Sequence, residues 1–218
     1  MEDTERKFLA RFIYESDAIE GIQDDIGLLE RQIAEDKYDG HVGAMFLLET
    51  WTRNETIGFV DKELICRIQG LITAEQHLKP GGPKLPDEFI GRYRMVNVLV
   101  GGRKCPSHKL VPALMNILLE GIREWQKGVK NCKSGHNICA VAYFHFIFER
   151  IHPFADGNGR TGRALVWYLF KYAGIKPFIF TSCDKHETYY LCFEKPEAMR
   201  GYFMRKMGLG IQTLPARR

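Results

Sequence analysis

A polar, glycine-rich segment at residues 151–163 (IHPFADGNGRTGR) lies between two apolar stretches and constrains the fold more than any other part of the chain. Apolar side chains recur at helical spacing over residues 137–150 (NICAVAYFHFIFER) and again over residues 162–173 (GRALVWYLFKYA). Gly174 and Pro177 are typical of the end of the second helix. The pattern therefore predicts a loop held between two buried helices.

The composition of this loop favours binding of an anion. The second helix opens on glycine and asparagine, and a helix N-terminus presents free backbone N–H groups and a positive dipole end. Gly157 and Gly159 let the backbone approach a ligand without a Cβ atom. Arg160 and Arg163, spaced i,i+3, can bind the same polyphosphate. The loop predicts a nucleotide phosphate site, and it is not a Walker A loop because GxxxxGK[ST] is absent from the sequence.

Residues 152–163 (HPFADGNGRTGR) match the signature HPFx[DE]GNGRxxR without a gap, so the chain resembles the Fic family of nucleotidyl transferases. The resemblance implies an all-α fold, a Fic-type helical bundle with a short β-hairpin flap. It also implies an enzyme, a protein adenylyltransferase that moves AMP from ATP to a Ser, Thr or Tyr hydroxyl of a target protein with Mg²⁺.

The resemblance assigns roles to the motif residues. His152 would be the general base, and imidazole suits this task because its ordinary pKa of about 6.5 leaves it mostly neutral at pH 7. Asp156 would hold Mg²⁺, which prefers carboxylate and phosphate oxygens. Phe154 would anchor the loop in the core. The remaining motif residues would bind the nucleotide: Gly157, Asn158 and Gly159 as an anion hole with the Asn158 side chain donating to the α-phosphate, Arg160 and Arg163 on the β- and γ-phosphates, and Thr161 and Gly162 beside them.

A second motif lies near the N-terminus, in residues 12–22 (FIYESDAIEGI). Ser16 and Glu20 are four residues apart and share a helical face, and Gly21 is a natural C-terminal stop. Spacing alone fits an ordinary amphipathic helix equally well. In the Fic family, however, the inhibitory helix carries [ST]xxxE[GN], and its glutamate takes the place of the γ-phosphate on the second motif arginine. The resemblance thus implies that Ser16 and Glu20 restrain the enzyme through Arg163.

The segment at residues 92–102 predicts a short strand and a turn, because Val96, Val98 and Val100 alternate before Gly101 and Gly102. A small structural hairpin would show the same pattern. The resemblance implies that it is the flap, which docks the target protein by strand addition and borders the nucleotide with Val100, Gly101 and Gly102.

Tyr189 and Tyr190 follow a polar run, and relatives place a tyrosine pair here in the adenine pocket, where aromatic faces stack on a base. The family often has an asparagine about two helical turns later, where this chain has Glu197. The tyrosine pair implies adenine as the default base, whereas Glu197 departs from the family pattern at the position that reads the base edge.

Periodicity predicts helices at residues 3–20, 25–37, 43–54, 61–73 and 107–127, and a last helix pair within residues 184–206. Asp25, Asp61 and Ser107 are the expected N-caps. A loop rich in proline and glycine, at residues 77–86, divides the chain into two predicted parts. The first is an N-terminal helical region (1–80), with the inhibitory helix at about 3–20. The second is a Fic core domain (81–218), which contains the flap and the motif loop at residues 151–163, called the catalytic loop below.

Composition excludes several other classes of protein. The chain has 218 residues and a net charge of +4 without a long basic run, which disfavours a nucleic-acid partner. Its six cysteines form no CxxC pair, its N-terminus is charged, and no apolar run approaches the roughly 20 residues of a membrane span. We therefore expect a cytoplasmic protein with reduced thiols and no membrane contact.

Three functions remain open on this basis. One is AMP transfer restrained by Glu20, with the chain itself among the candidate targets. The second is removal of AMP, or transfer of another phosphate-containing group, on the same fold. The third is a nucleotide-sensing regulator with little turnover, which the presence of both His152 and Asp156 disfavours. The glycine-asparagine-glycine-arginine core also departs from the lysine-containing variant of kinase-type relatives.

Overall fold

The computed structural model describes residues 2–37, 39–53 and 59–209. The described part is helical apart from turns and one two-stranded hairpin, so the all-α prediction is confirmed. Its main elements are α1 (Asp3–Ile19), α2 (Ile26–Ala34), α3 (Gly40–Arg53), α4 (Lys62–Ala74), β1 (Leu99–Val100), β2 (Arg103–Lys104), α5 (Val111–Gly128), α6 (Ser134–Ile151), α7 (Asn158–Tyr172) and α8 (Pro196–Lys206).

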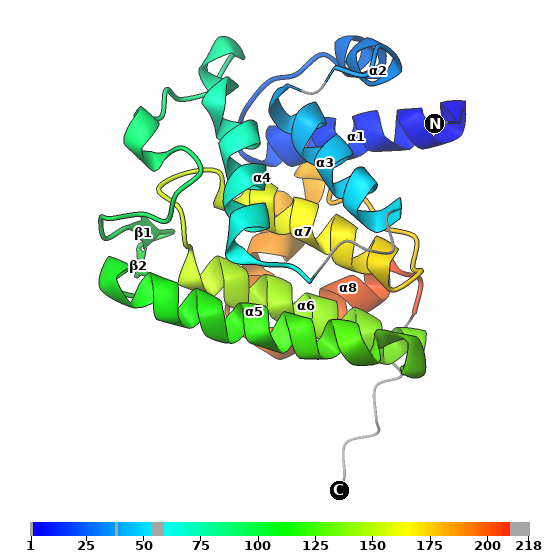
Figure 1. Ribbon diagram of the computed structural model, residues 1–218, viewed down its shortest axis with the longest axis vertical. Coiled ribbons are helices and arrows are strands. Elements are labelled where there is room, and N and C mark those ends of the chain that lie inside the picture. The colour runs from blue at the N-terminus through cyan, green and yellow to red at the C-terminus, as the bar shows by residue number, and fades with distance from the viewer. Residues whose placement is uncertain (1, 38, 54–58, 210–218) are drawn as a thin grey trace, which may run out of the picture.

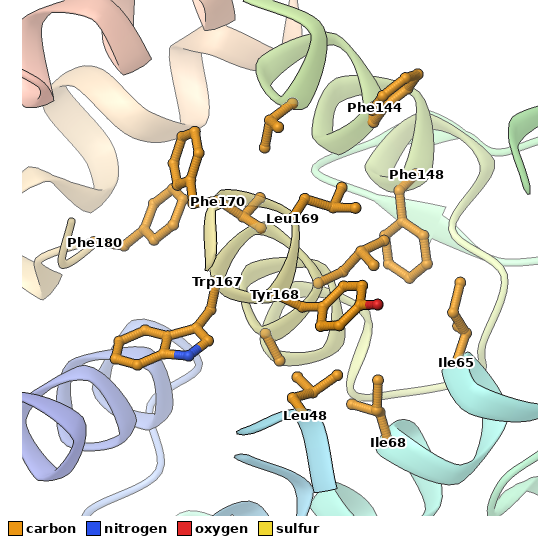
Figure 2. Packing of buried hydrophobic residues seen from close by; sticks show 14 of the residues in the cluster. Leu48, Ile65, Ile68, Phe144, Phe148, Trp167, Tyr168, Leu169, Phe170 and Phe180 are labelled. Carbon is orange, nitrogen blue, oxygen red and sulfur yellow. The ribbon is translucent and has the colours of Figure 1, made fainter. Parts of the chain in front are cut away.

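Helix α7 runs through the centre of the molecule. In Figure 1 the N-terminal helices α1, α3 and α4 lie on one side of α7, and α5 and α6 lie on the other. Residues 164–170 of α7 are all buried, and a helix that is apolar all round can be stable only when other elements cover every face. Figure 2 shows side chains from several helices converging on it, among them Leu48 of α3, Ile65 and Ile68 of α4, and Phe148 of α6.

Most helix boundaries lie within a few residues of the prediction, and the exceptions have local causes. Asp25 and Asp61 cap their helices, their Oδ1 atoms accepting from Leu28 N at 2.7 Å and Leu64 N at 2.8 Å. Ser107 makes no capping bond, because a 3₁₀ turn at His108–Leu110 precedes α5. The expected end of the third helix, Asn54, lies outside the described residues.

Helix α7 begins at Asn158, four residues before the predicted start. The first turn consists of polar motif residues, which a pattern of apolar side chains does not detect. Helix α6 likewise begins earlier, at Ser134. The predicted helix pair at residues 184–206 was wrong in its first half: residues 182–193 form short 3₁₀ and π turns, and only α8 is a regular α-helix.

The predicted hairpin turn is present. Leu99 pairs with Lys104 and Val100 with Arg103, and the two glycines between them have φ values of 54° and 78°. A two-residue hairpin loop with positive φ at both positions matches the twist of the strands and favours glycine. The strand is shorter than the valine alternation predicted, since it begins at Leu99. No helix in the described ranges is both long and apolar enough to cross a bilayer.

The central position of α7 predicts the cost of a cavity there. Leu169→Ala, at a side chain that is 1% exposed, should lower the free energy of unfolding by about 2–5 kcal/mol. The matched change Ile117→Ala, at a side chain on α5 that is 69% exposed, should shift it by no more than about 0.5 kcal/mol. Urea denaturation of both variants measures the difference, and equal effects would contradict the central role of α7.

Candidate active site

His152 follows the last residue of α6 and leaves the helix in the left-handed conformation, with φ 52° and ψ 64°. Its backbone N–H donates to Phe148 O at 2.9 Å, which closes the final turn. The imidazole borders a cavity of about 590 Å³ between the catalytic loop, the hairpin and the C-terminal turns. Of the predicted site residues, this cavity brings together Glu20, Val100, Gly101, His152, Gly159, Arg163, Tyr189 and Tyr190.

Arg94 holds the end of α6 in place, and the sequence analysis did not identify it. Only 2% exposed, its guanidinium donates to His152 O at 2.7 Å and to Ile151 O at 3.3 Å, carbonyls that the helix itself leaves unpaired. It also donates to Val96 O and Pro106 O, at 2.7 and 2.6 Å, on either side of the hairpin. One buried cation therefore links the position of the histidine to that of the hairpin.

The surroundings of His152 keep its imidazole neutral. Burial lowers the pKa of His152 to about 4, and the nearby Arg94 guanidinium adds to this effect. Glu149 lies one helical turn earlier, with its Oε2 3.9 Å from His152 Nδ1. Burial raises the pKa of the Glu149 carboxyl to about 8, so it is mostly protonated at neutral pH. The site thus combines an uncharged imidazole with an uncharged carboxyl group.

The catalytic loop is closed by Asn158. Its side-chain Oδ1 accepts from Phe154 N at 2.8 Å and its Nδ2 donates to Phe154 O at 3.0 Å. The Asn158 amide is therefore engaged within the loop through its oxygen and one of its two N–H donors, and its donation to an α-phosphate stays a prediction. Phe154 is fully buried, with its ring centroid 5.6 Å from that of Tyr93 and 6.4 Å from that of Phe148.

The N-terminus of α7 faces the cavity at Gly159. A Cβ atom on this residue would clash with the Glu20 carboxylate and lie 2.9 Å from Arg163 Nη1, so only glycine allows this approach. Gly162 and Thr161 do not border the cavity: a Cβ on Gly162 would clash with Glu149 of α6, and Thr161 is fully buried. These two residues shape the helix without facing the cavity.

Arg163 connects α7 to α1. Its Nη2 donates to Glu20 Oε1 at 2.7 Å and to Ser16 O at 2.8 Å, and its Nε donates to Ser16 Oγ at 3.0 Å. Arg163 is only 1% exposed. Burial alone would lower its pKa, but Glu20 and the neighbouring Tyr189 raise it overall, so the guanidinium is charged. The three residues predicted to form a regulatory group therefore do lie in contact.

Arg160 points elsewhere, so the two arginines do not share one position. Its Nη2 donates to Gln76 Oε1 at 2.5 Å, and its Nη1 lies 3.9 Å from the buried Asp17 carboxylate. Arg160 borders a separate cavity of about 230 Å³. Asp156 lies near it, its Oδ2 3.8 Å from Arg160 Nη2 and its Oδ1 accepting from Gly157 N at 2.7 Å.

The predicted adenine residues differ in exposure. Tyr189 is 1% exposed and its hydroxyl is 2.8 Å from His145 Nε2, whereas Tyr190 is 38% exposed. Both border the cavity of His152, and Phe193 adds a third aromatic ring. Gly102, at the tip of the hairpin, and Glu197, in the first turn of α8, do not border it.

The low pKa of His152 predicts a specific titration. In the folded chain the imidazole should stay mostly neutral down to about pH 4, against an ordinary value of 6.5. Between these two values the unfolded chain binds a proton that the folded chain does not, so this group lowers the free energy of unfolding as the pH falls. Side-chain NMR, with His152→Gln for assignment, measures the titration. A midpoint near 6.5 in the folded state would contradict this environment.

Comparison with known proteins gives the relationship of the chain. The Fic/DOC family model matches residues 59–170, which is more than half of the sequence. The protein adenylyltransferase Fic of Nematostella vectensis is 32% identical over 186 residues, covering 81% of this chain and 41% of that protein. The protein adenylyltransferase Fic of Culex quinquefasciatus is 29% identical over 191 residues, covering 85% of this chain and 36% of that protein. The chain thus spans less than half the length of these relatives.

Solved structures agree on the fold. A Fic-domain signaling protein from Bacteroides thetaiotaomicron superimposes with a TM-score of 0.71 at 19% identity, covering 94% of this chain and 85% of that one. Fic-1 from C. elegans superimposes with a TM-score of 0.63 at 19% identity, covering 90% of this chain and 59% of that one. With the catalytic loop, hairpin and central helix as described, the chain belongs to the Fic/DOC family.

Proposed function

We propose that this chain is a protein adenylyltransferase, which transfers AMP from ATP to a hydroxyl side chain of a target protein. The observation that carries the proposal is a neutral imidazole, His152, in one cavity with the N-terminus of α7 and the Arg163 guanidinium. The names of the curated relatives support the same reaction.

The chemistry follows from what each group can do. Neutral His152 takes the proton of the attacking hydroxyl as the oxygen bonds to the α-phosphorus, and pyrophosphate leaves. The backbone N–H groups at the start of α7 stabilise the negative charge on the phosphate oxygens. Arg163, once free of Glu20, binds the leaving phosphates. Tyr189 and Tyr190 provide the aromatic side of the cavity for adenine, and the hairpin edge at Leu99–Val100 aligns the target segment.

Asp156 fits the role of a magnesium ligand. Its side chain is 36% exposed, and each carboxylate oxygen accepts one hydrogen bond, which leaves lone pairs for a cation. Among the residues that the structure describes, no group of three His, Cys, Asp or Glu side chains could enclose a metal ion. Mg²⁺ often binds through one carboxylate together with substrate phosphates, and when bound it would offset the charge of the triphosphate.

Replacement of the base tests the reaction directly. With α-labelled ATP and Mg²⁺, the purified Glu20→Gly protein should place label on protein, and His152→Ala in that background should reduce transfer by at least about 100-fold. ATP affinity should stay within about threefold, since a general base acts on the transition state more than on nucleotide binding. EDTA provides the metal-free control.

Each alternative function gives a different result in this assay. ATP binding without label on any protein would favour the nucleotide-sensing regulator. Loss of label from a pre-modified target would show the reverse reaction. Undiminished transfer by His152→Ala would exclude the proposed mechanism.

We also propose that Glu20 restrains the enzyme. The Glu20 carboxylate occupies Arg163 and lies directly over Gly159, where the N-terminus of α7 would otherwise meet phosphate oxygens. A carboxylate and a phosphate cannot both bind the same side of one guanidinium, and like charges oppose their approach. The Glu20 side chain is 30% exposed, so the contact lies at the edge of the cavity and can open without unfolding the core.

The restraint predicts a gain of activity. Glu20→Gly should raise AMP transfer by at least about tenfold, which requires only about 1.4 kcal/mol of improved productive binding. Glu20→Gln, which keeps the size of the side chain but removes its charge, should give an intermediate gain. Arg163→Ala should be inactive with or without Glu20, because freeing a site that lacks its phosphate ligand has no benefit. An unchanged ATP affinity and transfer rate in Glu20→Gly would contradict the restraint and leave α1 with a packing role alone.

A further inference from the structure

Gln76 places one neutral amide between Asp156 and Arg160, two charged motif residues that do not border the cavity of His152. It lies just after α4, in the 3₁₀ turn Gln76–Leu78, and is 2% exposed. Its Nε2 donates to Asp156 Oδ2 at 2.7 Å and to Pro83 O at 2.9 Å, while its Oε1 accepts from Arg160 Nη2 at 2.5 Å. Both donors of the amide are used, on the carboxylate and on a backbone carbonyl.

The orientation of this amide is determined by its neighbours. A carboxylate can only accept and a guanidinium can only donate, so the NH₂ end must face Asp156 and the oxygen must face Arg160. A charged side chain in the same place would attract one of the two residues and repel the other. A glutamine satisfies both without adding charge.

Without the amide, Asp156 and Arg160 have an obvious alternative partner in each other. They are spaced i,i+4, and their nearest charged atoms are already 3.8 Å apart. Arg160 is 2% exposed, and its Nη1 already lies 3.9 Å from the Asp17 carboxylate, whereas the Nη2 that would lose Gln76 lies 3.8 Å from Asp156. An unpaired buried donor on a cation is costly, so Nη2 would turn to Asp156. A direct ion pair would take up the Asp156 oxygen that now accepts from Gln76. Each charge would then be offset by the other, so that both residues would attract a charged ligand less strongly.

The backbone of the loop is held separately from these side chains. Gln69 lies on α4, seven residues before Gln76, and is fully buried. It donates from Nε2 to Asp156 O at 3.1 Å and accepts from Gly91 N at 2.6 Å. Thr73 packs under Gly157, where a Cβ atom would lie 2.6 Å from Thr73 Cγ2. Removal of the Gln76 amide therefore frees the side chains of Asp156 and Arg160 while the loop stays anchored.

We propose that Gln76 is a positioning residue, which keeps Asp156 and Arg160 from closing into a direct hydrogen-bonded pair, so that the carboxylate remains available to a divalent cation and the guanidinium to nucleotide phosphates. The proposal rests on the proposed function, which assigns the cation to Asp156, and on the phosphate-binding role that the family resemblance implies for Arg160. Gln76 itself touches neither ligand, and its effect passes through Asp156 and Arg160.

The test is Gln76→Met in the Glu20→Gly protein, since methionine has a similar length but makes no strong hydrogen bond. ATP binding is measured by calorimetry over a series of Mg²⁺ concentrations and in EDTA. We expect half-maximal binding to require at least about fivefold more Mg²⁺, the effect of one hydrogen bond to a charged group. The matched control is Gln126→Met on α5, a buried glutamine whose Oε1 accepts from Val60 N at 3.0 Å. It should lower the melting temperature without shifting the Mg²⁺ dependence.

An unchanged Mg²⁺ dependence in folded Gln76→Met would overturn the proposal, as would an equal shift in Gln126→Met. Should Gln76→Met not fold, Gln76→Asn provides the same test, because its amide is one methylene too short to reach both charged groups. ATP binding that depends on Mg²⁺ but leads to no AMP transfer would remove the proposed function and leave the role of Gln76 intact. Absence of ATP binding by the Glu20→Gly reference would remove both.

Discussion

The burial of one cation, Arg163, links the fold of this chain to its chemistry. A guanidinium that is 1% exposed must have its donors paired, and α7 cannot supply the acceptors itself. Ser16 and Glu20 supply them from α1, across 147 residues of sequence in the case of Ser16. The pairing draws α1 against the central helix, and it places the Glu20 carboxylate over Gly159 at the N-terminus of α7. One contact thus contributes to the packing of the fold and to the proposed restraint of the enzyme.

Around this contact, residues outside the motif hold the catalytic loop in one conformation. Arg94 binds the carbonyls at the end of α6, Gln69 binds the Asp156 carbonyl, and Gln76 forms hydrogen bonds with both Asp156 and Arg160. A polar loop of this kind retains one conformation only if buried donors and acceptors from other elements match its backbone.

The same burial sets the protonation of the site. An imidazole with a pKa of about 4 is already in the form that a general base needs, although its low basicity limits its affinity for the proton. Glu149, neutral at pH 7 because burial raises its pKa to about 8, avoids a second negative charge beside Glu20.

The sequence by itself determined the loop between two buried helices, the caps at Asp25 and Asp61, and the glycine turn of the hairpin, because each depends on residues close together in the chain. The family resemblance added the pairing of Glu20 with Arg163. Only the tertiary structure decided that Asn158 binds Phe154, that Arg160 faces away from Arg163, and that Arg94 and Gln76 support the loop. A single buried arginine or glutamine has no periodic pattern, and its partners are set by how α1, α4 and the hairpin pack around α6 and α7.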